Sequence, residues 1–176
     1  SRVTVREAVK MVAGRGLLDL ARGRRAVVRE PDASAFGEFV SFVVQNDPQG
    51  VFDLVETRMS FEVQAAGLAA RRATRAGLAS IERMLERMRE AMAGSDAGDG
   101  EPAFDEVDIG FHRAIAVTAG NRILLGVFEA TAPAVRRSFS MSQRGRRARG
   151  QGSEHTVLAH QRILDCIAAG DVAGAE

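Results

Sequence analysis

Two residues whose side chains can bind a metal ion lie four positions apart in the stretch FDEVDIGFHRAIA. A helix over residues 103–119 would carry Asp108 and His112 on one face. The apolar row of that helix lies beside the pair and consists of Phe104, Val107, Phe111, Ala114 and Thr118. A carboxylate and an imidazole so close to a core need partners, because an unpaired buried charge is costly. A divalent metal ion is one such partner, and the alternatives are a hydrogen-bonded Asp–His pair or placement of both residues on the surface.

A third candidate ligand is His160, on a helix predicted over residues 153–169. It falls in the core-facing row Val157, His160, Leu164 and Ile167, whereas His155 lies outside that row and is expected to be solvated. On its own, such a histidine is more often a hydrogen-bonded core residue than a ligand. Combined with Asp108 and His112, it becomes a ligand from a facing helix. Aspartate and histidine ligands suit zinc, manganese, iron or nickel, and a three-ligand site keeps open positions for water or a small-molecule acid.

These ligands require a helical scaffold, and from about Ala33 onward the sequence predicts only helices. The clearest apolar periodicity comprises Leu78, Ile81, Leu85, Met88 and Met92, at alternating spacings of three and four. Helices are expected over residues 33–46, 51–74, 77–93, 103–119, 121 to about 140 with a kink or restart at Pro133, and 153–169, followed by a short helix after Asp171. Loops are expected over residues 94–102 and 143–152. We therefore expect an all-α fold, an antiparallel bundle of six or seven helices.

The first 30 residues differ from this bundle in charge and pattern. They hold eight basic and three acidic side chains, a net charge of +5, whereas the whole chain carries +1. The sequence pattern predicts one helix over residues 1–16 and two short strands, Leu18–Leu20 and Ala26–Val28. A helix with a hairpin is too small to fold alone, so we expect further chain before Ser1. A basic head on an acidic body is typical of a protein that meets a polyanion, and a chance excess of arginine is the alternative.

The composition excludes several classes of protein. Apolar residues make up 45% and charged residues 27% of the chain, which favours a packed core over a disordered chain. No apolar run approaches the roughly 18 residues that span a bilayer, and residues 1–30 lack the apolar segment of a signal peptide. The single cysteine, Cys166, excludes an internal disulfide and fits a reducing compartment. We therefore expect a cytoplasmic protein with no membrane partner.

Several stretches together resemble a known family. Residues 1–30 resemble the second half of the winged helix of GntR-family transcription regulators, through SRVTVREA, Gly16-Leu17 and the wing Arg22-Gly23-Arg24. Residues 51–176 are similar to the FCD effector domain of the FadR subfamily, through DLVETRMSFEVQAAGLAARRAT (53–74), DIGFHRAIAVTAGN (108–121) and HQRILDCIAAGD (160–171). Each motif is weak alone, and the combination is fairly specific. The wing departs from the family pattern at Arg25 and Ala26.

The resemblance implies a metal centre. Asp108, His112 and His160 match the family's metal ligands, and zinc is the first expectation, with nickel, manganese or iron as alternatives. The family's fourth ligand is a histidine that would follow Asp171 by two helical turns and a loop, beyond Glu176.

The resemblance also implies effector contacts. Arg58 matches a position near the effector cavity and could hold a carboxylate bidentately, while a structural ion pair is the alternative. Asn121 is a second candidate effector contact, and its alternative role is a helix N-cap.

For the head, the resemblance implies contacts with double-stranded DNA. Arg2, Thr4 and Arg6 match positions that face the major groove, where arginine suits guanine and threonine suits a phosphate or a thymine methyl group. Arg24 in the wing would contact the backbone or the minor groove. For each of these residues, a solvated side chain is the alternative.

We therefore predict a partial winged-helix DNA-binding domain over residues 1–31 and a helical domain over 32–176 that dimerises and binds the effector. The predicted function is that of a homodimeric repressor, not an enzyme, which reads a palindromic operator and senses a small carboxylic acid through its metal ion. Two alternatives stay open: a metal-free regulator of the same family that senses a larger acyl ligand, and a helical-bundle metalloenzyme.

Overall fold

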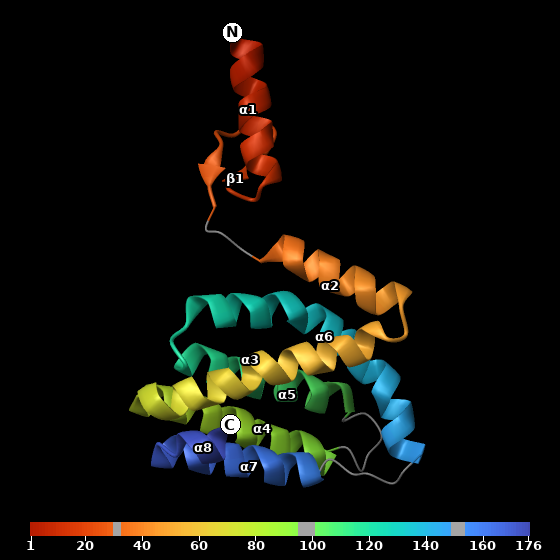
Figure 1. Ribbon diagram of the computed structural model, residues 1–176, viewed down its shortest axis with the longest axis vertical. Helices are drawn as coiled ribbons and strands as arrows, with labels where there is room; N and C mark the ends of the chain where they lie inside the picture. Colours follow the sequence, from red (N-terminus) through yellow and green to blue (C-terminus); the bar gives the residue numbers. More distant parts are fainter. Residues whose placement is uncertain (30–32, 95–100, 149–153) are drawn as a thin grey trace. The chain divides into compact units, whose positions relative to one another are not determined.

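The computed structural model describes residues 1–29, 33–94, 101–148 and 154–176, and the side chains in these ranges except at 94, 101–103 and 140–148. The chain divides into two compact units, Ser1–Ser34 and Ala35–Glu176. Figure 1 traces the chain from the N-terminal helix and hairpin to the helices of the second unit.

The first unit is a helix followed by a β-hairpin, as predicted. Its elements are α1 (Arg2–Gly14), β1 (Leu18–Asp19) and β2 (Val27–Val28), and the two strands pair antiparallel. The side chain of Ser1 caps α1 by accepting a hydrogen bond from the backbone of Thr4. Gly23 has a φ of 79°, a left-handed conformation that glycine adopts without steric cost. Both strands are shorter than the sequence predicted, and no residue of α1 is buried.

The second unit is built from helices alone within the described residues, which confirms the predicted all-α bundle. The helices are α2 (Ser34–Asn46), α3 (Gly50–Arg72), α4 (Arg75–Gly94), α5 (Glu101–Thr118), α6 (Arg122–Ala148), α7 (Glu154–Ala169) and α8 (Val172–Ala175). Helix α5 packs against α3, α4 and α6, and α4 also packs against α7 (Figure 1). Helix α8 packs against α7 and α3, and Figure 1 shows α4 and α7 next to each other at one side of this unit.

Two tight connections fix how the later helices follow one another. Gly120 has a φ of 63° and ends α5, and the Asn121 side chain accepts hydrogen bonds from the backbone N–H groups of Ile123 and Leu124 at 3.0 and 3.3 Å. Gly170 has a φ of 70° and ends α7, and Asp171 caps α8 through the Gly174 N–H. In both connections a glycine in the left-handed conformation is followed directly by an N-cap residue, so one helix ends and the next begins within a few residues.

Helix α6 differs from the sequence prediction. It continues as one helix through Pro133 and on to Ala148, so the expected restart at the proline, the end near residue 140 and the loop from residue 143 are wrong. The alternative expectation, a kink, agrees with Figure 1, in which α6 changes direction along its length. A proline removes one backbone hydrogen bond, and the burial of Ala132, Ala134 and Val135 around it holds the helix in place. The rest of the predicted loop, residues 149–152, lies outside the described residues.

The core consists of two clusters, and α5 contributes to both. The first cluster joins α3, α4, α5 and α7 around Ile81, Leu85, Met88 and Phe111. The second joins α2, α3, α5 and α6 around Leu54, Ile109, Ala116, Phe128 and Val135. At the period of an α-helix, Asp108 and His112 fall on the strip of α5 between its two apolar faces. The structure thus sets both polar side chains beside the core, as the apolar row of this helix predicted.

Candidate metal centre

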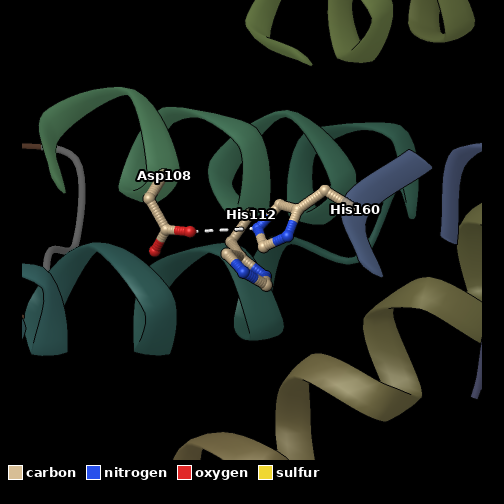
Figure 2. A group of neighbouring side chains, drawn as sticks. All are labelled: Asp108, His112 and His160. Carbon is tan, nitrogen blue, oxygen red and sulfur yellow. Dashed lines mark ion pairs between the residues drawn. The ribbon is translucent and has the colours of Figure 1, made fainter. Parts of the chain in front are cut away.

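The three predicted ligands meet in one cluster. Asp108 and His112 project from α5 and His160 projects from α7, and the three side chains point toward one another (Figure 2). One ligand atom from each lies within 4.8 Å of the other two. Asp108 and His160 are buried and His112 is mostly buried. The structure therefore brings together residues 52 positions apart in the chain at their widest separation, from Asp108 to His160.

The hydrogen bonding of His160 fixes which of its ring nitrogens can bind a cation. Nδ1 lies 2.8 Å from the backbone carbonyl oxygen of Thr156, and a carbonyl can only accept, so Nδ1 carries a proton. In the neutral ring, Nε2 is then an acceptor. It is buried, makes no hydrogen bond within the described residues, and lies 3.0 Å from Asp108 Oδ1 (dashed line in Figure 2). Two acceptors that face each other repel, so this contact requires a cation, either a proton or a metal ion.

His112 is held from its other side by α3. Its Nδ1 lies 3.4 Å from Glu62 Oε2. The other carboxylate oxygen of Glu62 accepts a hydrogen bond from Arg58 Nε at 2.7 Å and forms an ion pair with Arg58 Nη2 at 2.6 Å. The side chains of Arg58 and Glu62 are only 13% and 18% exposed, so this ion pair is poorly screened by water. Arg58, Glu62 and His112 therefore form a continuous polar chain that ends at the ligand cluster.

Phe111 packs against both histidine rings. Its ring centroid lies 4.4 Å from that of His160 and 5.7 Å from that of His112. Phe111 is fully buried in the first cluster, so the core restricts the tilt of both rings.

The environment favours the ligand forms of two of these residues. Burial lowers the pKa of His112 below its ordinary value, and the negative charges of Glu62 and Asp108 offset this only in part. For Asp108, burial raises the pKa, but the contact with His160 and the positive charges nearby outweigh it and the pKa is lowered. A neutral imidazole and an ionised carboxylate are the forms that bind a metal ion.

The cluster fits a divalent ion by its donor set. Two imidazoles and one carboxylate match zinc and the neighbouring first-row metals, and tetrahedral ligands at metal distances of about 2.0–2.1 Å lie about 3.4 Å apart. The contact between His160 Nε2 and Asp108 Oδ1 is already within that spacing, at 3.0 Å. The orphaned, buried Nε2 is the clearest sign of fit, because an ion beside it would satisfy an atom that otherwise lacks a partner.

The predicted effector residues lie in two different environments. Arg58 forms the ion pair with Glu62 described above, and its guanidinium carbon lies 6.0 Å from the centroid of the Phe139 ring. Asn121 caps α6 through its side-chain oxygen. Effector binding by either residue stays a prediction.

The predicted DNA-binding residues are all exposed in the first unit. Arg2 and Arg6 are four positions apart and share one face of α1. Thr4 lies on another side of the helix, and its hydroxyl is 3.1 Å from that of Ser1. Arg24 lies in the segment between the two strands. Their contacts with DNA stay a prediction.

Sequence reasoning missed Glu62 as part of the site. The available signal was its position four residues after Arg58, the spacing at which opposite charges pair along a helix. Its approach to His112 had no such signal, because it depends on how α3 packs against α5.

The profile of the FCD domain family matches residues 53–176, which hold all three ligands of the cluster. The chain belongs to the FCD family. More fully, it is a GntR-family transcription regulator with an FCD domain, of the FadR subfamily, as the sequence motifs indicated. Its second unit contains the FCD domain, whose first helix is α3.

Known regulators match the chain beyond the FCD domain. The HTH-type transcriptional regulator LutR of Bacillus subtilis is 27% identical, with 100% of this chain and 78% of LutR covered. The Uxu operon transcriptional regulator of Escherichia coli is 31% identical over 73% of this chain, and that match spans only 48% of the E. coli protein. Among solved structures, a Streptococcus agalactiae GntR protein covers 99% of this chain, and 76% of its own, with a TM-score of 0.74 and 20% identity, which shows a shared fold.

These relatives are transcription regulators, not enzymes, which agrees with the predicted class and removes the metalloenzyme alternative. Across the described part of the chain, no helix combines the length and apolar character needed to cross a membrane.

The lowered pKa of His112 leads to a prediction about the metal-free protein. The unfolded chain takes up a proton on His112 near the ordinary pKa of 6.5, whereas the folded chain does so only at lower pH. The unfolded state therefore binds more protons in this window, and the free energy of unfolding should fall as the pH drops below 6.5, by up to about 1.4 kcal/mol per pH unit. The lowered pKa of Asp108 acts in the same direction below 3.8.

Urea unfolding between about pH 7 and about pH 5 measures this dependence. A His112→Asn variant should lose the part of the slope due to His112, and the exposed His155→Asn variant serves as the control. A slope that is the same in wild type and His112→Asn would contradict the assignment.

Proposed function

We propose that this chain belongs to a cytoplasmic, homodimeric repressor that binds operator DNA through its first unit and senses a small carboxylic acid at a metal ion in its second unit. The observation that carries the sensor half is the buried Nε2 of His160, which makes no hydrogen bond within the described residues and lies 3.0 Å from Asp108 Oδ1, next to His112. Zinc is the metal we propose, with nickel, manganese and iron as alternatives from the same donor set.

Asp108, His112 and His160 would hold the ion. When bound, the ion would supply open coordination positions that a carboxylate can occupy. Two features of the surrounding protein favour an acidic effector. The cluster is largely excluded from water, and the positively charged Arg58 lies on its α3 side. An arginine has five N–H donors in a planar fork, and Glu62 accepts from only two of its nitrogens. Donors therefore remain for the carboxylate of an effector, which supports Arg58 as its anchor, and Asn121 is the second proposed contact.

The DNA-binding half rests on family membership and on charge. The first unit has a net positive charge, and α1 presents Arg2 and Arg6 on one exposed face. We propose that this face enters the major groove with Thr4 beside the backbone, and that Arg24 contacts the backbone or minor groove. The proposed domain boundary lies at residue 31, between the hairpin and α2.

A homodimer is supported by an apolar stripe on α3. Phe52, Val55 and Met59 recur at spacings of three and four along one face of the helix, and they are 64%, 47% and 62% exposed. Exposed apolar stripes of this kind mark protein interfaces. We propose a second copy of this chain as the partner, because two heads related by a twofold axis match a palindromic operator.

The metal proposal predicts one tightly bound zinc ion per chain. A His160→Ala variant should bind zinc more than about 100-fold more weakly, because it removes a ligand, and outer-shell changes alone typically cost 10–100-fold. Competition with a chelating dye measures the affinity, and elemental analysis gives the stoichiometry. The exposed His155→Ala variant is the control. If the wild type holds no stoichiometric metal, the metal-free acyl sensor replaces this proposal.

The DNA proposal predicts that Arg2→Ala with Arg6→Ala weakens binding to duplexes selected by the protein from a random pool. We expect the binding free energy to weaken by about 1–3 kcal/mol for each arginine that contacts a base. For each arginine that contacts a phosphate, we expect the slope of log affinity against log salt concentration to decrease by about one. Fluorescence anisotropy over a salt series measures both. The matched control is Arg83→Ala with Arg87→Ala, which removes the same charge at the same spacing from exposed positions of α4. If the two double variants bind the selected DNA with equal affinity, the proposed DNA contacts are wrong.

The dimer proposal predicts that Met59→Glu shifts the chain from dimer to monomer. A charge in an apolar interface is desolvated without a partner, so the dissociation constant of the dimer should rise. Sedimentation velocity over a concentration series reports the shift. Leu158→Glu, at a residue of α7 with 58% exposure, should leave the dimer intact. A wild type that stays monomeric at all concentrations refutes the proposed interface.

A further inference from the structure

Glu62 has a neighbour at each of its two carboxylate oxygens. Oε1 accepts a hydrogen bond from Arg58 Nε at 2.7 Å and lies 2.6 Å from Arg58 Nη2, and Oε2 lies 3.4 Å from His112 Nδ1. The side chain is 18% exposed, and it comes from α3, which contributes no ligand to the three-residue cluster. It is therefore the residue through which α3 contacts a ligand of the proposed metal centre.

An ionised carboxylate only accepts hydrogen bonds. A ring nitrogen that faces one is favoured in its protonated form, and in a neutral imidazole the other nitrogen then keeps its lone pair. Glu62 on the Nδ1 side thus favours a free lone pair on His112 Nε2. Arg58 acts on this arrangement in turn, because its Nε hydrogen bond and the ion-pair contact of its Nη2 with Oε1 restrict the rotation of the carboxylate.

His160 has a matching arrangement with a different partner. Its Nδ1 donates to the Thr156 carbonyl on its own helix, which leaves Nε2 free toward Asp108. Both histidines thus have an acceptor beside Nδ1, a backbone carbonyl for one and a carboxylate from a neighbouring helix for the other. In the neutral form of each ring, a proton on Nδ1 leaves Nε2 as the nitrogen with a lone pair.

From this we infer that Glu62 is a positioning residue of the metal centre, which holds His112 with its proton on Nδ1 so that Nε2 is presented to the ion. The inference rests on the proposed function, in which Asp108, His112 and His160 hold a divalent metal. Because Glu62 also binds Arg58, it links the metal ligand to the proposed effector anchor. Loss of such outer partners typically costs 10–100-fold in metal affinity.

The first readout is the tautomer of His112 in the metal-free chain, from the ¹⁵N chemical shifts of its ring nitrogens. In the wild type we expect a protonated Nδ1 and an unprotonated Nε2. In Glu62→Ala the two tautomers should mix, while Glu62→Gln, which keeps an acceptor oxygen without the charge, should partly retain the wild-type pattern. A merely structural or long-range electrostatic role for Glu62 would not change the tautomer. A wild-type His112 with its proton on Nε2 would overturn the inference.

The second readout is zinc affinity by dye competition. Glu62→Ala should bind zinc about 10–100-fold more weakly, and Glu62→Gln should fall between it and the wild type. The matched control is Glu129→Ala, which breaks an ion pair of the same 2.6 Å length, to Arg113, at an exposed position of α6. Wild-type zinc affinity in Glu62→Ala would overturn the inference.

A second variant and a readout that needs no metal keep the test decisive. If Glu62→Ala fails to fold because Arg58 is left without a partner, the double variant Arg58→Leu with Glu62→Leu removes both charges together and should show the same loss of tautomer and affinity. If the wild type binds no zinc, the proposed function fails by itself, while the ¹⁵N readout still decides the role of Glu62 in the metal-free chain.

Discussion

The contact between His160 Nε2 and Asp108 Oδ1 is the constraint around which the second unit is organised. When the His160 ring is neutral both atoms are acceptors, both side chains are buried, and 3.0 Å separates the two atoms. A folded protein keeps such a pair only if a cation relieves the repulsion or the surrounding structure compensates for it. The Thr156 carbonyl makes the arrangement stricter, because it fixes the proton of the ring on the opposite nitrogen. Asp108 and Glu62 place two carboxylates beside the histidines, and Arg58 forms an ion pair with Glu62.

Helix α5 explains how the fold maintains this contact. Its two apolar faces are buried in different clusters, and the strip between them carries Asp108 and His112. A helix held on both sides cannot turn to relieve an unfavourable polar contact without disrupting one of the cores. The ligand from α7 meets this strip because Leu164 and Ile167 belong to the same cluster as Phe111. Apolar packing therefore sets the positions of the polar atoms.

Much of this was predictable from spacing. The apolar rows gave the helices, the four-residue step from Asp108 to His112 gave a shared face, and the core row of α7 gave His160. Other features depend on contacts that no local pattern encodes. Helix α6 continues through Pro133 because tertiary burial outweighs one lost hydrogen bond, and Glu62 meets His112 because two helices pack together. The sequence could identify the three residues of the cluster, but the distances between them and the unpartnered Nε2 of His160 required the structure.

Burial of α5 on both sides also means that, in the proposed metal centre, the affinity for an ion would depend on the packing of the two cores. A substitution that shifts α5 within these cores would change the separation of Asp108 and His160, and each 1.4 kcal/mol of misfit corresponds to about a tenfold change in binding constant. A regulator built this way can be retuned to a different metal concentration by a substitution such as isoleucine to valine in its core, with every ligand left in place. Selection on ion sensitivity would then act on hydrophobic positions that never contact the ion.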